Sequence, residues 1–312
     1  MDLLNETHPE GDAGTGEEKS AAPCQRAIWL ASYPKSGNTW VRIFFHNLIR
    51  ELRGQSESSQ DINALHEMGG REPLSPWFSR RLGKPVQEAT RQEIAKARFE
   101  VQADMVQRLN GPLCVKTHNA VAHVEGYPTV NFDVTLAGVY IVRNPLDVAV
   151  SYAAFTGLPV DAVIANMADP AAMTTMDNRQ VYEFLGSWSF HAASWMSIPN
   201  RPILLLRYED MLAAPERSFA RLAAFLRLKA TEEQLKRAIE KSSFAESARQ
   251  EDERGFIERP PAAQKFFRVG KAGQWREALT QDQINAVIGA HAPMMMRFGY
   301  MAEDCGADGL LR

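Results

Sequence analysis

A short turn at positions 32–40, with the sequence SYPKSGNTW, contains the first residues of this chain whose types and spacing suggest chemistry. The turn follows an apolar run and leads into a helical pattern, so its amides and the positive end of the helix dipole can converge on an oxyanion. Gly37 allows close approach of the backbone, and Lys35 supplies a full positive charge. The sequence therefore predicts a phosphate site formed with Ser36, Asn38 and Thr39. The alternative is an ordinary N-cap cluster beside a solvated lysine, because Ser, Asn and Thr are favoured at helix starts.

A second signal is Arg143, which stands at the end of an apolar run and just before a helix start. A guanidinium at the carboxyl end of a core strand is well placed to bind phosphate through parallel hydrogen bonds. Pro145 and Asp147 suit the first turn of a helix, and Ser151 follows two turns into it. The segment predicts a second anion contact, with a structural ion pair of Arg143 as the alternative.

The tripeptide Lys116-Thr117-His118 follows another apolar run and supplies a candidate base. An imidazole with an ordinary pKa near ~6.5 suits proton abstraction at neutral pH. A lone histidine is more often a packing or surface residue, but the neighbouring anion site favours a general base here. The other six histidines lie outside such a constellation, and we expect them to be structural.

A fourth segment, Phe267-Arg268-Val269-Gly270-Lys271-Ala272-Gly273-Gln274-Trp275, interleaves cations with glycines. Glycine makes such a segment flexible, and its cations can close on an anion. The segment predicts an anion clamp, with an exposed basic loop as the alternative.

The elements that must position these residues are short apolar strands separated by helices. We expect strands at Ala27–Ser32, Leu113–Lys116, Gly138–Val142 and Ile203–Arg207. We expect helices at Thr39–Leu52, within Pro85–Leu109, and from Asn144–Asp147 onward. Strands that are apolar throughout and alternate with helices predict an α/β fold, a three-layer sandwich with a central parallel sheet. Ligands of such sheets bind outside the carboxyl ends of the strands, where the first three signals fall.

Three stretches break the alternating pattern, and we predict long loops at Leu65–Lys84, Thr156–Asp177 and Ala245–Gln264. Loops of this length are either lids and binding segments or disordered. Apolar residues in and near them predict a cavity for a small, partly apolar compound, with core or lid packing as the alternative. These residues are Trp77, Phe78, Phe155, Leu158, Met167, Met173 and Phe256.

The composition of the 312 residues excludes several classes of protein. A formal net charge of −3 gives no basic field for nucleic acid or an anionic membrane. The three cysteines have no disulfide or zinc spacing, and no signal segment or membrane span is expected, so we predict a cytoplasmic protein. We expect a disordered acidic tail at residues 1–25, one domain at 26–302 and a C-terminal tail at 303–312.

Taken together, these segments resemble the PAPS-dependent cytosolic-type sulfotransferase family, as a bacterial-like member; PAPS is 3′-phosphoadenosine 5′-phosphosulfate. Residues 33–40 resemble its 5′-phosphosulfate loop, 143–151 its 3′-phosphate segment, and 116–118 its catalytic tripeptide. Tyr208-Glu209-Asp210-Met211, Ser242-Ser243-Phe244 and 268–275 also match in order. The resemblance implies a P-loop-like sulfotransferase fold and transfer of a sulfuryl group to a hydroxyl or amine, with PAP (3′,5′-ADP) as product.

The resemblance also implies roles for single residues. His118 takes the proton of the acceptor, Lys35 stabilises charge on the leaving oxygen, and Lys116 assists at the sulfuryl oxygens. Ser151 hydrogen-bonds Lys35 until the acceptor binds. The 3′-phosphate is held by Arg143, Ser151, Arg268 and Gly270. The rest of the nucleotide is held by Ser36, Gly37, Asn38, Thr39, Trp40, Tyr208, Ser242, Phe244, Val269 and Lys271, with Trp40 and Phe244 on the adenine. No metal is required.

The sequence departs from the family pattern at two places. Animal members have Arg-Lys-Gly in the C-terminal loop, whereas Val269 stands here and a lysine follows only at Lys271. A homodimer is compatible with the sequence, but the dimer motif of many relatives is not matched at Arg276, Thr280-Gln281 and Asn285. The alternative function is a P-loop-type kinase that uses Mg-ATP, although its G-x-x-x-x-G-K-[S/T] loop is not present.

Overall fold

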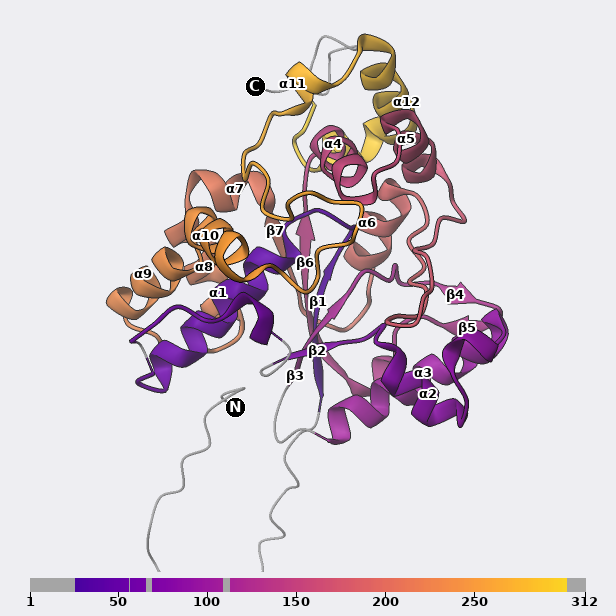
Figure 1. Ribbon diagram of the computed structural model, residues 1–312, viewed down its shortest axis with the longest axis horizontal. Helices are drawn as coiled ribbons and strands as arrows, with labels where there is room; N and C mark the ends of the chain where they lie inside the picture. The colour runs from indigo at the N-terminus through magenta and orange to yellow at the C-terminus, as the bar shows by residue number, and fades with distance from the viewer. Residues whose placement is uncertain (1–25, 56, 66–68, 109–112, 302–312) are drawn as a thin grey trace, which may run out of the picture.

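The computed structural model describes residues 26–55, 57–65, 69–108 and 113–301, and its centre is a five-stranded parallel sheet (Figure 1). The strand order is β2-β3-β1-β6-β7. The strands are β1 Ala27–Ser32, β2 Gly69–Arg71, β3 Leu113–Thr117, β6 Thr135–Val142 and β7 Ile203–Arg207. The predicted tails at 1–25 and 303–312, and Cys24 and Cys305, lie outside the described residues.

The register of the sheet brings three of the predicted segments to one edge. Ala31 of β1 lies opposite Thr117 of β3, and Ser32 of β1 lies opposite Ile141 of β6. The residues that follow these strands therefore emerge side by side at what is here called the carboxyl edge of the sheet. Because β1 is central and all six of its residues are buried, the turn that is predicted to bind phosphate starts from an enclosed strand.

Helices cover both faces of the sheet because successive side chains of β1 point to opposite faces. Ile28 and Leu30 belong to the apolar cluster under α1 Asn38–Leu52, α7 Tyr208–Ala213, α8 Pro215–Phe225 and α9 Glu232–Lys241. Trp29 and Ala31 belong to the larger cluster on the other face. That face is covered by α3 Arg91–Gln107, α4 Pro145–Thr156, α6 Trp188–Met196 and α12 Gln281–Arg297. The predicted three-layer α/β architecture with a central parallel sheet is confirmed.

The remaining elements are short. Helix α2 Ser75–Leu82 packs against α3, and α5 Val160–Ala168 packs against α4 and α12. Helix α10 Phe244–Arg254 contacts the 3-10 turn Ile62–Ala64, and α11 Trp275–Ala278 contacts α4. A small antiparallel pair is formed by β4 His123–Val124 and β5 Tyr127–Pro128. The 3-10 turns are Ile62–Ala64, Val86–Glu88 and Phe132–Val134. After α10 an extended segment, orange in Figure 1, crosses in front of the sheet before it reaches α11.

The predicted strands are confirmed, while the three predicted long loops are partly wrong. Leu65–Lys84 contains β2 and α2, Thr156–Asp177 contains α5, and Ala245–Gln264 contains most of α10. Two of these elements were missed for local reasons: β2 has only three residues, two of them glycine, and α10 is a mostly polar helix with few apolar residues to mark its period. The helix expected within Pro85–Leu109 begins at Arg91, after a capping box between Thr90 and Glu93; Leu109 lies outside the described residues.

Among the described helices, none by itself has the length and apolar character needed to cross a membrane. Helices α4 and α5 reach those limits only together, and they are bent by 120° relative to each other.

Candidate active site

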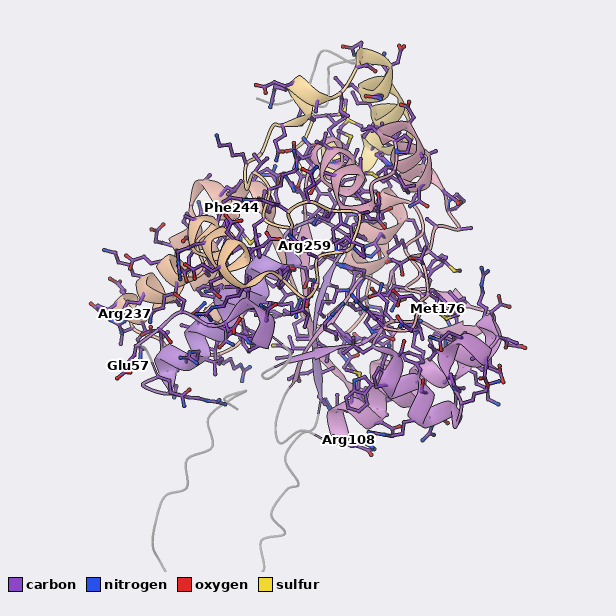
Figure 2. The ribbon with its side chains drawn as sticks, in the orientation of Figure 1. Glu57, Arg108, Met176, Arg237, Phe244 and Arg259 are labelled. Atoms are coloured by element: carbon purple, nitrogen blue, oxygen red, sulfur yellow. The ribbon has the colours of Figure 1, made fainter. Side chains whose placement is uncertain are left out.

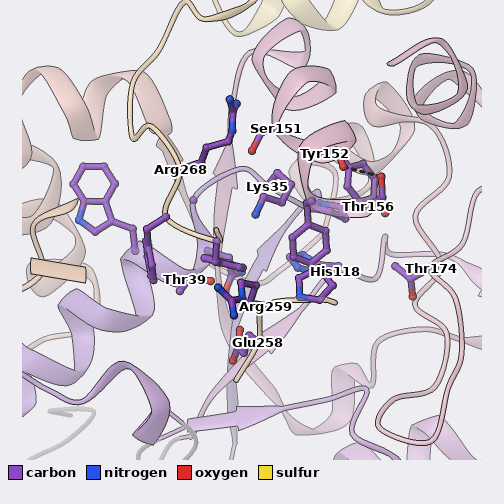
Figure 3. Close-up of a pocket in the computed structure, with 18 of the residues that line it drawn as sticks. Lys35, Thr39, His118, Ser151, Tyr152, Thr156, Thr174, Glu258, Arg259 and Arg268 are labelled. Atoms are coloured by element: carbon purple, nitrogen blue, oxygen red, sulfur yellow. Dashed lines mark hydrogen bonds between the residues drawn. The ribbon is translucent and has the colours of Figure 1, made fainter. Parts of the chain in front are cut away.

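A cavity of about 960 Å³ opens at the carboxyl edge of the sheet (Figure 3). Nearly all of the predicted site residues line it, although they come from distant parts of the chain. They are Lys35, Gly37, Asn38, Thr39, Trp40, Lys116, His118, Arg143, Ser151, Tyr208, Ser242, Phe244, Arg268, Val269 and Gly270. Ser36 and Lys271 are not among the lining residues. Figure 2 shows Phe244 and Arg259 toward the middle of the molecule, whereas Arg237 lies at its outer edge.

The turn after β1 has an unusual backbone. Lys35 has φ 66° and Gly37 has φ 106°, both in the left-handed region that non-glycine residues rarely adopt. A Cβ at Gly37 would lie 2.8 Å from the Tyr208 ring, so a glycine is required there for space as well as for φ. Asn38 ties the turn to β1, because its Nδ2 donates to the Leu30 carbonyl at 2.8 Å.

Four buried polar atoms in or beside the wall of the cavity, near the turn after β1, have no hydrogen-bond partner among the described residues. They are Ser36 Oγ, Asn38 Oδ1, Trp40 Nε1 and Arg143 Nε. Buried donors are normally hydrogen-bonded, and an unpaired one costs free energy. Three of these atoms are donors and two cations, Lys35 and Arg143, line the same region, so this end of the cavity suits an anionic ligand.

Arg143 joins the turn to the C-terminal segment. Its guanidinium donates to the Lys35 carbonyl at 3.2 Å and to the Lys271 carbonyl at 3.0 Å, and it lies 4.2 Å from the centre of the Tyr208 ring. No carboxylate forms an ion pair with Arg143 among the described residues, so the structural ion pair considered above is absent. Lys271 thus contributes its carbonyl to the site, and its exposed side chain does not line the cavity.

The C-terminal segment is held over the cavity by Asp147, which accepts hydrogen bonds from the amides of Gly273 at 2.7 Å and Trp275 at 3.2 Å. Asp147 therefore does more than favour the start of α4. Gly270 has φ 64° and packs directly against the Phe244 ring, leaving no room for a Cβ. These contacts place Arg268, Val269 and Gly270 at the cavity wall.

His118 is neutral and holds a defined tautomer. Its Nδ1 lies 2.7 Å from the Ser32 carbonyl, which can only accept, so Nδ1 carries the proton and Nε2 keeps its lone pair. Burial, together with the charge of Lys116, lowers the pKa of His118 to about 3. The imidazole is thus in the unprotonated form that a general base requires.

Glu183 is a functional candidate that the sequence analysis missed. It is buried in the irregular segment between α5 and α6 and forms an ion pair with Lys116, with Nζ and Oε2 3.1 Å apart. Its carboxylate also accepts the backbone N–H of His118 and the Thr117 hydroxyl. The signal that could have revealed it is a lone carboxylate within the apolar run Val181–Leu185.

His191 corrects the expectation that all other histidines lie away from the site. Its Nε2 donates to the His118 carbonyl at 3.0 Å, and its Nδ1 accepts from the Tyr140 hydroxyl at 2.9 Å. Burial lowers the pKa of His191 to about 4, so it is neutral too. His191 does not line the cavity, and its contact with the site is the hydrogen bond to the backbone carbonyl of His118.

Lys35 lies between two aromatic rings. Its Nζ is 4.3 Å from the centre of the Phe155 ring and 4.0 Å from that of Phe266. Ser151 and Lys35, both among the described residues, do not form the hydrogen bond that was expected between them, although both side chains line the cavity (Figure 3). Burial and the nearby charge of Arg143 lower the pKa of Lys35 to about 7.

The cavity has two halves. The donor half contains the turn after β1 and the residues around Trp40, Arg143 and Arg268, and the acceptor half lies on the other side of His118 (Figure 3). The apolar side chains of the acceptor half include Leu74, Tyr152, Phe155, Leu158, Val163, Met173, Ile257 and Phe266. The cavity is also lined by the charged side chains of Arg71, Arg179, Glu183, Glu258 and Arg259. Figure 3 shows Arg259 and Glu258 between Thr39 and His118.

Of the apolar residues considered for an acceptor pocket, Phe155, Leu158 and Met173 line the cavity. The core alternative holds for the rest. Phe78 and Met167 are buried in the main apolar cluster, Trp77 packs against that cluster, and Phe256 belongs to a smaller cluster with Phe266.

No group of three or more His, Cys, Asp or Glu side chains that could hold a metal ion occurs among the residues described by the structure. The Glu258 carboxylate instead forms ion pairs with two guanidinium groups, that of Arg42 at 3.0 Å and that of Arg71 at 3.7 Å.

The curated proteins similar to this chain include several that are named sulfotransferases. The curated relatives include sulfotransferase 1A1 of cattle, 25% identical over 85% of this chain and 81% of the relative, and sulfotransferase 1B1 of dog, 27% identical over 82% and 79%. Similar solved structures include mouse sulfotransferase SULT7A1 complexed with PAP, with a TM-score of 0.54, 21% identity and coverage of 87% and 84%. Retinol dehydratase in a complex with retinol and PAP gives a TM-score of 0.58 at 19% identity, covering 88% and 82%. These structural likenesses concern the fold.

The family model described as "Sulfotransferase domain" matches residues 25–298, which is most of the chain and spans every segment of the cavity. This match does not favour the kinase alternative. The chain belongs to the sulfotransferase family.

Proposed function

We propose that this enzyme transfers the sulfuryl group of PAPS to a hydroxyl or amine of a small, partly apolar acceptor, giving PAP and a sulfated product. The observation that carries the proposal is the meeting of three groups in one cavity. These are the unprotonated Nε2 of His118, the ammonium of Lys35, and Arg143 with an unpaired Nε.

The residues of the donor half fit a nucleotide with several anionic groups. We assign the 5′-phosphosulfate to Lys35 and the turn Ser36–Thr39, because these amides lie at the N-terminus of α1 and the Ser36 hydroxyl has no partner. We assign the 3′-phosphate to Arg143, Ser151, Arg268 and Gly270, and the adenine to the aromatic rings of Trp40 and Phe244. Tyr208, Ser242, Val269 and Lys271 complete the site around these groups.

His118 acts as the general base of the reaction. Since Nδ1–H is held by the Ser32 carbonyl, Nε2 is the atom that takes the proton of the acceptor. PAPS, when bound, supplies the sulfuryl group together with a nucleotide phosphate as the leaving group. Lys35 stabilises the charge that develops on the leaving oxygen, and Lys116 acts near the sulfuryl oxygens.

The acceptor is proposed to be partly apolar because Phe155, Leu158 and Met173 line the acceptor half. Pockets of this make-up bind small molecules through apolar contact and orient them with a few polar groups. The similar retinol dehydratase structures contain retinol and androsterone, which are apolar compounds that each carry oxygen.

The cellular location, the domain bounds and the oligomeric state of the enzyme stay predictions. We propose a single catalytic domain over residues 26–302 in a cytoplasmic protein. The residues at the positions of the family dimer motif have local partners instead: Thr280 caps α12, and the Gln281 side chain donates to Asn285 at 2.9 Å.

A thermal-shift experiment tests the donor assignment. We expect 3′,5′-ADP to raise the melting temperature without magnesium, and ATP and 5′-ADP to raise it much less, because preferential binding to the folded state raises apparent stability. An equal or larger shift with Mg-ATP would contradict the proposal. Turnover is then measured with radiolabelled PAPS and a panel of phenols, sterols and arylamines.

A further inference from the structure

Glu183 is the buried group most closely connected to the proposed base. Its side chain is 2% exposed and lines the cavity beside Lys116 and His118. One carboxylate oxygen pairs with Lys116 Nζ at 3.1 Å, and the other accepts the His118 backbone N–H and the Thr117 hydroxyl. The peptide N–H of Glu183 is itself fixed, since it donates to Thr174 Oγ1 at 2.8 Å. The carboxylate is therefore held rigidly by the tripeptide that carries the base.

These contacts make Glu183 an anion and exclude it as the base. Burial opposes its ionisation, but the charge of Lys116 and the contacts with His118 and Lys116 together lower the pKa of Glu183 to about 2. Both of its oxygens are also occupied by donors. Glu183 must therefore act on the reaction through its neighbours.

The neighbour that needs an anion is Lys116. Its ammonium is almost fully buried and stands two residues before His118. A like charge nearby disfavours the protonated form of an imidazole, and a buried ammonium without a counter-charge is unfavourable in itself. Without Glu183, the imidazole would have to accept a proton beside an unmatched positive charge.

We propose that Glu183 is a positioning residue for sulfuryl transfer, which matches the charge of Lys116 and fixes the His118 backbone so that the imidazole can take up the acceptor proton. The proposal rests on the proposed function. In the resting enzyme, Lys116 and Glu183 together carry a net charge of zero. Of these three residues, only His118 changes its charge during the reaction.

The test compares Glu183→Gln, which keeps the shape and one accepting oxygen but loses the charge, with Glu183→Asp, which keeps the charge at a shorter reach. We expect Glu183→Gln to lower kcat by ~30-fold or more, with the KM for PAPS changed less than ~3-fold, because the donor half is untouched. Glu183→Asp should retain more activity than Glu183→Gln. A purely structural role predicts the reverse order, since Gln is the closer match in shape.

The matched control is Glu72→Gln. Glu72 is a buried carboxylate paired with Arg98 and bonded to Asn119, the residue after His118, but it does not line the cavity. The melting temperature of this variant should be lower than that of wild type, while its kcat stays within ~3-fold of wild type, because the charges beside the base are unchanged. A control as impaired as Glu183→Gln would overturn the proposal.

If Glu183→Gln does not fold, Glu183→Asp carries the test by itself, because it keeps the carboxylate but shortens its reach toward Lys116 by one methylene. We expect its kcat to fall further than that of Glu72→Asp, while the KM for PAPS changes less than ~3-fold in both variants. An equal kcat in Glu183→Asp and Glu72→Asp would overturn the role of charge matching. Wild-type protein without any turnover would overturn the proposed function as well, whereas active wild type with equally active Glu183→Gln would overturn the role of Glu183 alone.

Discussion

The donor and acceptor halves of the cavity are built in different ways. Groups of the donor half and the base follow directly after parallel strands: Lys35 after β1, His118 after β3 and Arg143 after β6. The acceptor half depends on α4, α5 and irregular segments around Met173 and Ile257. Sheet register thus fixes the groups of the reaction, while connecting segments shape the space for the compound that is modified.

The two halves also differ in how firmly their side chains are held. Arg143 and Lys116 are each bonded to fixed backbone or carboxylate groups and are almost fully buried. Leu158 and Ile257, in contrast, are 53% and 58% exposed at the acceptor half. Exposed apolar side chains at a cavity suit contact with a ligand. The comparison predicts large effects for changes at the strand ends and small ones at the connecting segments.

The largest effect is expected for His118→Ala. Loss of a general base lowers turnover by ~10²- to 10⁴-fold, while the affinity for 3′,5′-ADP should change by less than ~3-fold because the donor half remains. Steady-state rates with radiolabelled PAPS and calorimetry with 3′,5′-ADP measure both. His123→Ala, at an exposed histidine of β4, is the control and should behave as wild type. Unchanged turnover in His118→Ala would remove histidine from the mechanism.

An intermediate effect is expected from pH. The pKa of Lys35 is lowered from 10.5 to about 7 in the empty site, so the ammonium is present below pH 7 and is lost above it. Since the charged form binds an anion, the affinity for 3′,5′-ADP should fall between pH 7 and pH 9, by up to ~10-fold per pH unit. Calorimetry across this range measures the slope.

Lys35→Arg provides the comparison for this slope, because a guanidinium stays charged throughout the range. Its affinity for 3′,5′-ADP should be nearly independent of pH between 7 and 9. The assignment of the slope to Lys35 would be wrong if the variant kept the dependence of the wild type.

The smallest effect is expected for Leu158→Ala. Shortening one half-exposed apolar side chain should raise the KM for an apolar acceptor by only ~2- to 5-fold, since part of the side chain is already in water. Binding of 3′,5′-ADP should not change. Phe190→Ala is a control at a similarly exposed residue outside the cavity. A large loss of 3′,5′-ADP affinity in Leu158→Ala would show that the two halves are not separate.

The sequence predicted the donor half well because its signals are local. A strand, a turn with Gly37 and a helix start lie within a few residues of one another, and the parallel sheet then aligns Lys35, His118 and Arg143. No local pattern reveals that Glu183 meets Lys116, because that contact joins residues 67 positions apart.

The acceptor half and helix α10 were harder to predict, each for a physical reason. Apolar spacing marks buried side chains without separating core from cavity, so Phe78 and Met167 looked the same as Phe155 and Met173. Helix α10 lacks an apolar stripe and is marked instead by charged pairs, such as Arg249 with Glu246 and Glu253. Such pairs support a helix only weakly.

The central place of β1 has a consequence for how the enzyme is inactivated. The strand is bonded on both sides, to β3 and β6, and none of its residues is exposed. Its amides can therefore exchange with deuterium only when the whole sheet opens, whereas segments bearing Leu158 and Ile257 can open locally. At low concentrations, denaturant should first reduce the specificity of the enzyme for its acceptors. Catalysis should be abolished only when the whole protein unfolds.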